Sequence, residues 1–251
     1  MSYNPFSLSG KTILVTGASS GIGRSIAIEC SKMGASFIIT GRNEVRLSET
    51  LSMLCGDGHI IVSADITEEE QIVNMVEQLP ILDGVVHCAG VGVRKPVQAI
   101  KQSDIDSVFA PNVMAPILLQ KHLLKKKRLN KGTSIVFIAS RAPFAPAAGN
   151  AVYSASKGAI IGYAKTLGLE LAPKQMRVNC ICPAMVWTDL IRRDAENMGE
   201  DFAAAEARYP LKRFGQPEDV AWLSVYLLSN ASSWMTGSCI DITGGGELVL
   251  V

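Results

Sequence analysis

The sequence lacks any apolar run long enough to cross a membrane, and its first residues show no basic segment followed by the apolar core of a secretory signal. It also lacks an excess of charge of either sign, because 24 Lys and Arg residues stand against 23 Asp and Glu residues, for a formal net charge of +1. A protein dedicated to nucleic acid normally carries a strongly basic face, so this balance argues against that class. We therefore expect a cytoplasmic protein with neither a membrane nor a nucleic acid as its partner.

The cysteines lack the spacings of a metal site or of a disulfide framework. The six positions are Cys30, Cys55, Cys88, Cys180, Cys182 and Cys239. Two of them, Cys180 and Cys182, alternate with apolar residues as in a strand, where cysteine packs as a small hydrophobic side chain. A chain of 251 residues also builds its core without disulfides. We expect reduced thiols and no bound metal.

No stretch rich in Pro, Gly or Ser divides the chain, and short β-branched runs alternate with longer amphipathic stretches. Strands are expected at residues 12–16, 36–40, 59–63, 82–87, 134–138, 177–181 and 238–242. Helices are expected at residues 22–33, 43–54, 102–128 and 152–171. Two more are expected, one that follows a capping box formed by Thr67 and Glu70 and one that begins at Pro217. Apolar strands separated by helices predict one doubly wound α/β domain over residues 1–251, a Rossmann fold whose seven-stranded parallel sheet carries helices on both faces.

A glycine-rich turn follows the first expected strand and opens directly into a helix, with glycines at Gly17, Gly21 and Gly23. Glycine lets the backbone approach a pyrophosphate, whose charge then lies at the helix N-terminus. The spacing is G-x-x-x-G-x-G, and its position in a strand–turn–helix unit is the one that dinucleotide binding requires. The alternative is a tight turn that binds nothing.

The end of the second expected strand indicates which dinucleotide is bound. An acidic residue there would bind a ribose 2′-hydroxyl, whereas this chain has Gly41 and Arg42, and arginine suits a 2′-phosphate. We expect NADP(H) to be preferred over NAD(H), unless Arg42 pairs with a surface carboxylate. Asp65 is expected to accept a hydrogen bond from the adenine amine, and the alternative is a carboxylate at the start of a helix.

Tyr153 and Lys157 lie four residues apart in an expected helix and therefore share a face. A free phenol, with a pKa near ~10, is a poor acid or base at neutral pH, but a neighbouring ammonium favours the phenolate form. Ser140 ends the fifth expected strand, and the carboxyl ends of parallel strands face the ligand crevice. The three side chains predict general acid–base chemistry on a substrate oxygen.

Taken together, these motifs closely resemble the short-chain dehydrogenase/reductase family of oxidoreductases, over residues 8–246. In this resemblance Ser140, Tyr153 and Lys157 match the catalytic residues, and Asn112 looks like a fourth catalytic member. Residues 179–183 followed by Thr188 resemble the segment that holds the nicotinamide. The cofactor-binding residues that we expect are Gly17, Ser19, Ser20, Gly21, Ile22, Gly23, Gly41, Arg42, Asp65, Ile66, Cys88, Ala89, Gly90, Asn112, Tyr153, Lys157, Pro183, Val186 and Thr188.

The resemblance implies a mechanism in which hydride passes between the nicotinamide and a carbonyl carbon. Tyr153 would protonate the carbonyl oxygen, Ser140 would orient it, and Lys157 would support the tyrosine and bind the nicotinamide ribose. Asn112 would hold a water that carries protons towards Lys157. Such proteins are also expected to be homotetramers, built on the long helices after the fourth and fifth strands.

Three departures from the family pattern stand out. The usual Asn-Asn-Ala-Gly after the fourth strand is His87-Cys88-Ala89-Gly90 here, so the asparagine hydrogen bonds that hold the sheet are lost. We expect Cys88 to be inert packing rather than a redox group. Pro111 should kink the helix that carries Asn112 and free a carbonyl for the water, and Ala184 replaces a glycine near the nicotinamide.

The substrate is expected under a variable segment at residues 187–210 that acts as a lid. Met185 and Trp187 would form an apolar wall and Arg141 would contact an anion, with core packing and a surface charge as the alternatives.

The chain most resembles the 3-oxoacyl-[acyl-carrier-protein] reductase branch, although sugar-alcohol and hydroxysteroid dehydrogenases share the motifs. The alternative of another class is a dinucleotide-binding sensor without catalysis. It would be favoured by loss of Ser140, Tyr153 or Lys157, and all three are present. The basic run at residues 121–128 is either a helix end complementing the macrodipole or a dock for an acidic carrier protein.

Overall fold

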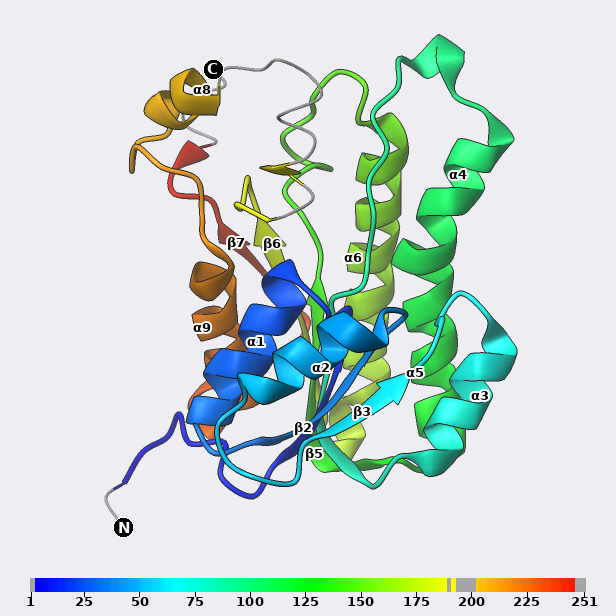
Figure 1. Ribbon diagram of the computed structural model, residues 1–251, viewed down its shortest axis with the longest axis vertical. Helices are drawn as coiled ribbons and strands as arrows, with labels where there is room; N and C mark the ends of the chain where they lie inside the picture. The colour runs from blue at the N-terminus through cyan, green and yellow to red at the C-terminus, as the bar shows by residue number, and fades with distance from the viewer. Residues whose placement is uncertain (1–2, 189–190, 193–201, 247–251) are drawn as a thin grey trace.

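A seven-stranded parallel sheet forms the centre of the structure, a computed structural model that describes residues 3–188, 191–192 and 202–246 (Figure 1). The strand order is β3-β2-β1-β4-β5-β6-β7, so the order reverses between β1 and β4. The strands are β1 (Thr12–Thr16), β2 (Ser36–Gly41), β3 (Ile60–Ser63), β4 (Leu82–His87), β5 (Leu129–Ile138), β6 (Arg177–Pro183) and β7 (Cys239–Ile242). The predicted doubly wound fold is therefore confirmed.

Helices cover both faces of the sheet (Figure 1). The α-helices are α1 (Gly21–Lys32), α2 (Glu44–Ser52), α3 (Glu69–Gln78), α4 (Gln102–Phe109), α5 (Ala115–Lys125), α6 (Ala151–Leu171), α8 (Phe202–Arg208) and α9 (Pro217–Leu228). Short 3₁₀ turns are η1 (Val97–Ala99), η3 (Ala172–Lys174) and η4 (Asn230–Ser232), and η2 (Ala110–Met114) is a π-helical turn. None of the helices in the described part of the chain is long and apolar enough to cross a membrane.

Each face of the sheet has its own hydrophobic core. One core packs α3, α5 and α6 on the sheet and includes Leu119 and Ile160, whereas the other packs α1, α2 and α9 and includes Ile26 and Val220. Neighbouring residues of one strand join opposite cores, as Leu14 and Val15 of β1 do. This is why the strands are apolar on both faces, and each fully buried side chain of this size contributes roughly 1.5–3 kcal/mol.

Two local predictions need correction. The single helix expected at residues 102–128 is divided into α4, η2 and α5; the irregularity at Pro111 agrees with the expected kink, and Pro116 is a second residue with no N–H to donate within a regular α-helix. The capping box of Thr67 and Glu70 does not form. Thr67 donates both its backbone N–H and its hydroxyl to Asp65 Oδ1, at 3.0 and 2.7 Å, so the start of α3 is shaped by Asp65.

The amino end of β6 is tied to the end of α9 by Arg177. Its guanidinium donates to the carbonyl oxygens of Leu227 and Ser229 at 2.8 and 3.1 Å, and to Ser232 Oγ at 2.8 Å. These carbonyls lie where α9 ends and have lost their helical donors. One half-buried guanidinium, together with the hydroxyls of Ser134 and Ser232, therefore satisfies a helix end that faces the sheet.

We expect Arg177→Leu to lower the free energy of unfolding by about 2–4 kcal/mol, because it removes the charge-assisted hydrogen bonds to the Leu227 and Ser229 carbonyl oxygens, which keep only the hydroxyl donors of Ser134 and Ser232. Lys174→Leu removes a charge of the same sign from the exposed turn η3 and should change stability by less than about 0.5 kcal/mol. Urea unfolding of both variants provides the measurement, and equal losses would contradict this account of Arg177.

Candidate active site

The turn after β1 lies against the loop after β4 at the point where the strand order reverses. Gly17 and Gly21 adopt left-handed φ angles of 69° and 54°, which favour glycine. A Cβ at Gly17 would lie 2.8 Å from Ala89 Cα, too close for any side chain. A Cβ at Gly21 would lie 3.3 Å from Thr188 Cγ2, so the segment after β6 also reaches this turn.

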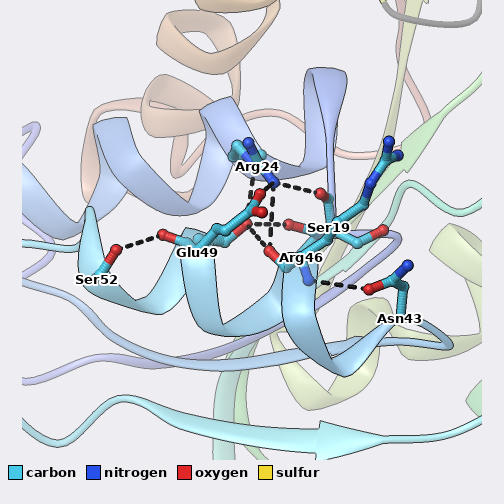
Figure 2. A network of polar contacts seen from close by, with 8 residues as sticks. Ser19, Arg24, Asn43, Arg46, Glu49 and Ser52 are labelled. Atoms are coloured by element: carbon cyan, nitrogen blue, oxygen red, sulfur yellow. Dashed lines mark hydrogen bonds and ion pairs between the residues drawn. The ribbon is translucent and has the colours of Figure 1, made fainter.

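Arg24, in the first turn of α1, ties the glycine-rich turn to α2 (Figure 2). Its guanidinium donates to the Ser19 carbonyl oxygen at 2.7 Å, to Thr50 Oγ1 at 2.9 Å and to Glu49 Oε2 at 3.0 Å. A cation in the first turn of a helix opposes the macrodipole, and that conflict is the sequence signal that could have identified Arg24. The network joins the turn to α2 and fixes the Ser19 backbone.

Arg42 and Asp65 lie side by side after β2 and β3. Arg42 Nη1 is 3.8 Å from Asp65 Oδ2, and the two side chains are 71% and 31% exposed. Partial burial disfavours the charged carboxylate, but the hydrogen bonds from Thr67 outweigh burial and lower the pKa of Asp65. An ion pair this long and this exposed stabilises little. Arg42 therefore keeps its guanidinium accessible to a ligand, whereas Asp65 has only Oδ2 left for an adenine amine.

The end of β4 is held to β1 through backbone N–H groups and a threonine hydroxyl. Thr16 Oγ1 accepts hydrogen bonds from the backbone N–H groups of Cys88 and Ala89 at 3.1 and 3.2 Å, which joins β1 to β4. The His87 ring stacks on Phe137 with centroids 4.5 Å apart. Burial lowers the pKa of His87 to about 4 and raises that of Cys88 to about 12. A neutral thiol of this kind is inert packing.

Helix α6 brings Tyr153 and Lys157 to the carboxyl edge of the sheet. Lys157, only 6% exposed, donates from Nζ to the Ile138 carbonyl oxygen at 2.8 Å and lies 5.7 Å from the centroid of the Tyr153 ring. Ser140, expected at the end of the strand, lies instead in the loop just beyond Ile138, where β5 ends, and its Oγ accepts from the Ala142 N–H at 3.1 Å. The ammonium of Lys157 therefore lies beside the Tyr153 ring, on the helix face that the two residues share.

Asn112 connects η2 to its surroundings through its whole side-chain amide. Oδ1 accepts from the Val91 N–H at 2.8 Å, and Nδ2 donates to the Val91 carbonyl oxygen at 2.9 Å and to Ser156 Oγ at 3.0 Å. A Cβ at Gly90 would lie 3.0 Å from Asn112 Oδ1 and 3.4 Å from Lys157 Nζ. Asn112 thus holds the loop after β4 beside Lys157, and Ser156 is a supporting residue that the motif alone did not indicate.

The residues predicted to contact substrate have partners within the protein. Arg141 Nη1 donates to Asp241 Oδ2 at 2.8 Å, so a substrate anion would have to compete with that carboxylate. Trp187 Nε1 donates to Glu206 Oε1 at 2.7 Å, and the indole packs 5.3 Å from the Phe214 ring centroid. Met185 lines a cavity of about 110 Å³. Within the predicted lid at 187–210, residues 189–190 and 193–201 lie outside the described residues.

The basic run at residues 121–128 is the end of α5 and the start of the connection to β5. Lys121 pairs with Glu69 at 2.8 Å and Lys126 with Glu77 at 2.7 Å. The run lies where β4 and β5 begin, whereas Tyr153 lies at the edge where they end. The two places are therefore separated by the length of β4, about 20 Å. These pairs favour the helix-end interpretation over a carrier dock.

Comparisons with known proteins agree with this geometry. Residues 17–247 match the family model described as enoyl-(acyl carrier protein) reductase. A 3-oxoacyl-[acyl-carrier-protein] reductase of Rickettsia felis is 34% identical over 96% of this chain and 99% of the relative. A short-chain type dehydrogenase/reductase structure from Mycobacterium ulcerans has a TM-score of 0.87 and 32% identity, covering 96% of this chain and 91% of that one. A candidate NAD(P)-dependent gluconate 5-dehydrogenase from Beutenbergia cavernae, with NADP bound, has a TM-score of 0.88 and 31% identity, covering 98% and 100%.

We expect Gly17→Ala and Gly10→Ala to differ sharply, although both glycines have similar φ angles of 69° and 75°. A Cβ at Gly10 meets no atom within 4 Å, so Gly10→Ala should lower the free energy of unfolding only by the backbone strain of alanine at a positive φ, about 1 kcal/mol. Gly17→Ala adds the clash with Ala89, which should lower the free energy of unfolding by about 1–3 kcal/mol more. It should also weaken dinucleotide binding. Urea unfolding and a dinucleotide titration measure both effects, and similar behaviour of the two variants would refute the role of the close approach.

Proposed function

The chain belongs to the short-chain dehydrogenase/reductase family, NAD(P)-dependent enzymes that interconvert alcohols and carbonyl compounds, and on this premise we propose that it is an NADP(H)-dependent carbonyl reductase. The observation that carries the proposal is the meeting of Tyr153, buried Lys157 and Asn112 beside the glycine-rich turn. The proposed unit is one domain over residues 1–251, in which residues 187–210 cover the substrate.

The cradle formed by the turns after β1, β4 and β6 fits a dinucleotide. Gly17 and Gly21 leave the space that any side chain would fill, and Thr188 closes the other side. The accessible guanidinium of Arg42 offers a planar set of donors to a 2′-phosphate, which supports the preference for NADP(H). The cofactor would supply the hydride when bound, and the protein would supply orientation and the proton.

Tyr153 is the proposed general acid. Its hydroxyl would donate a proton to the carbonyl oxygen as that oxygen becomes an alcohol, and Ser140 Oγ would orient the oxygen by hydrogen bonding. The phenolate left on Tyr153 would be stabilised by the Lys157 ammonium, 5.7 Å from the ring centroid, because charges interact more strongly in a place this buried. Asn112 would keep the loop after β4 in position around this pair.

A 3-oxoacyl thioester is the substrate class that we propose, supported by the reductase of Rickettsia felis and by the family description. A sugar acid or sugar alcohol is the second candidate, favoured by the similarity to the Beutenbergia cavernae protein. We also propose a cytoplasmic homotetramer assembled on α4, α5 and α6. The exposure of Met114, in η2 between α4 and α5, and of Leu169 in α6, 52% and 79%, supports the use of this surface in assembly.

We expect the protein to oxidise NADPH, followed at 340 nm, with acetoacetyl-CoA as substrate. Tyr153→Phe should lower kcat by roughly 10²–10⁴-fold, the usual contribution of a general acid, while NADPH binding measured by fluorescence stays unchanged. Residual activity near that of the natural protein would contradict the role of Tyr153. Turnover of sugar ketones but not of the thioester would select the second substrate class and leave the chemistry intact.

Arg42→Ala should raise KM for NADPH by roughly 10–100-fold and leave KM for NADH nearly unchanged, since one or two charge-assisted hydrogen bonds to the 2′-phosphate would be lost. Lys131→Ala provides the control, because it removes an exposed positive charge near the start of β5, at the opposite edge of the sheet. Steady-state kinetics with both cofactors gives the comparison. An equal loss with NADH and NADPH would rule out 2′-phosphate recognition by Arg42.

A further inference from the structure

A small cavity of about 10 Å³ lies next to Lys157, between η2, α6 and the ends of β4 and β5. Its lining includes His87, Asn112, Phe137 and Lys157. A volume of roughly 10–15 Å³ holds one water molecule, provided that the lining offers two or more polar partners. The cavity meets the volume requirement at its lower end, so the polar groups around it decide whether water occupies it.

His87 supplies a buried polar atom that needs a partner. The ring is only 5% exposed, and Nε2 lies 3.2 Å from Gln120 Oε1. An amide oxygen only accepts, so Nε2 carries the ring proton and Nδ1 is left as an acceptor. Within residues 3–188, 191–192 and 202–246, Nδ1 has no hydrogen-bond partner. A buried acceptor without a donor is costly, and in native proteins it usually indicates an ordered water.

Lys157 supplies a donor on the same cavity. Its ammonium has three N–H groups, of which one is directed to the Ile138 carbonyl oxygen at 2.8 Å. The side chain is 6% exposed, and a buried charge is stable only when hydrogen bonds replace its lost hydration. A water in the cavity would accept from a second N–H group and so restore part of that hydration.

The backbone of η2 forms another wall of the cavity. Pro116 has no N–H, so the Asn112 carbonyl oxygen, four residues earlier, cannot accept the usual α-helical hydrogen bond, and η2 forms a π-helical turn there. Both residues line the cavity. The residues that line this space for one water thus supply a donor, Lys157 Nζ, and an unpartnered acceptor, His87 Nδ1, with the backbone of Asn112 beside them.

We propose that this cavity holds one water molecule and that His87 is the positioning residue that orients it, by accepting a hydrogen bond at Nδ1 while the water accepts one from Lys157 Nζ. The inference rests on the proposed function, in which Lys157 stabilises the Tyr153 phenolate, and it deepens that function. A water near Asn112 and Lys157 follows from the family resemblance, whereas the role of His87 follows from this structure. No covalent bond changes, and the water acts by holding the ammonium charged and in place.

A high-resolution crystal structure of the natural protein tests the water directly. The expected result is a water at ~2.7–3.2 Å from both His87 Nδ1 and Lys157 Nζ. A dry cavity, or a water that contacts Lys157 but not His87, would overturn the proposal. This measurement needs no turnover, so it separates failure of the proposal from failure of the proposed reductase activity, and it is decisive even if no variant of His87 folds.

Three variants test the positioning role. His87→Phe keeps the ring stacked on Phe137 but removes the acceptor, and kcat should fall roughly tenfold, the effect of one lost hydrogen bond to a charged network, with KM values unchanged. His87→Asn returns an acceptor and should recover most of kcat. Phe137→Leu disturbs the same packing without removing a polar atom and is the control. If His87→Phe loses no more activity than Phe137→Leu, or if His87→Asn recovers nothing, His87 has only a packing role.

Discussion

The close contact between the turn after β1 and the loop after β4 is the constraint on which the rest of the site depends. Gly17 has no side chain, and its ideal Cβ would lie 2.8 Å from Ala89 Cα, so the two backbones meet directly. Thr16 Oγ1 fixes this contact by accepting from the Cys88 and Ala89 N–H groups. Because the loop is held there, Gly90 reaches Lys157, and a cradle for phosphate and a proton-transferring pair share one edge of the sheet.

Much of this arrangement could be predicted from the sequence, because its signals are local. Apolar runs on both faces of a strand indicate a covered parallel sheet, and a spacing of four residues puts Tyr153 and Lys157 on one face of a helix whatever surrounds it. Pro111 correctly predicted that the helix around Asn112 is irregular. Register also follows, since each strand of a parallel sheet ends at the same edge.

The rest depends on pairs that are distant in the chain. Thr67 and Glu70 have the pattern of a capping box, but Asp65 takes both Thr67 donors, and spacing alone does not rank the two acceptors. The sequence around Arg141 indicates a cation available to substrate, but in the structure its guanidinium donates to Asp241, which lies 100 residues away in the chain. Short-range patterns predict which elements form, whereas the partner of a long polar side chain is decided by tertiary packing.

The substitution of asparagine by His87 illustrates how such pairs constrain one another. An imidazole at this position is buried, and its Nε2 reaches Gln120, 33 residues further along the chain, at 3.2 Å. The amide oxygen of Gln120 sets which ring nitrogen carries the proton, and through that choice it sets whether Nδ1 accepts or donates. Removing one member of a buried polar network leaves the others unsatisfied. The pairing of His87 with Gln120 of α5 is thus a dependence between distant residues that no motif around position 87 reveals.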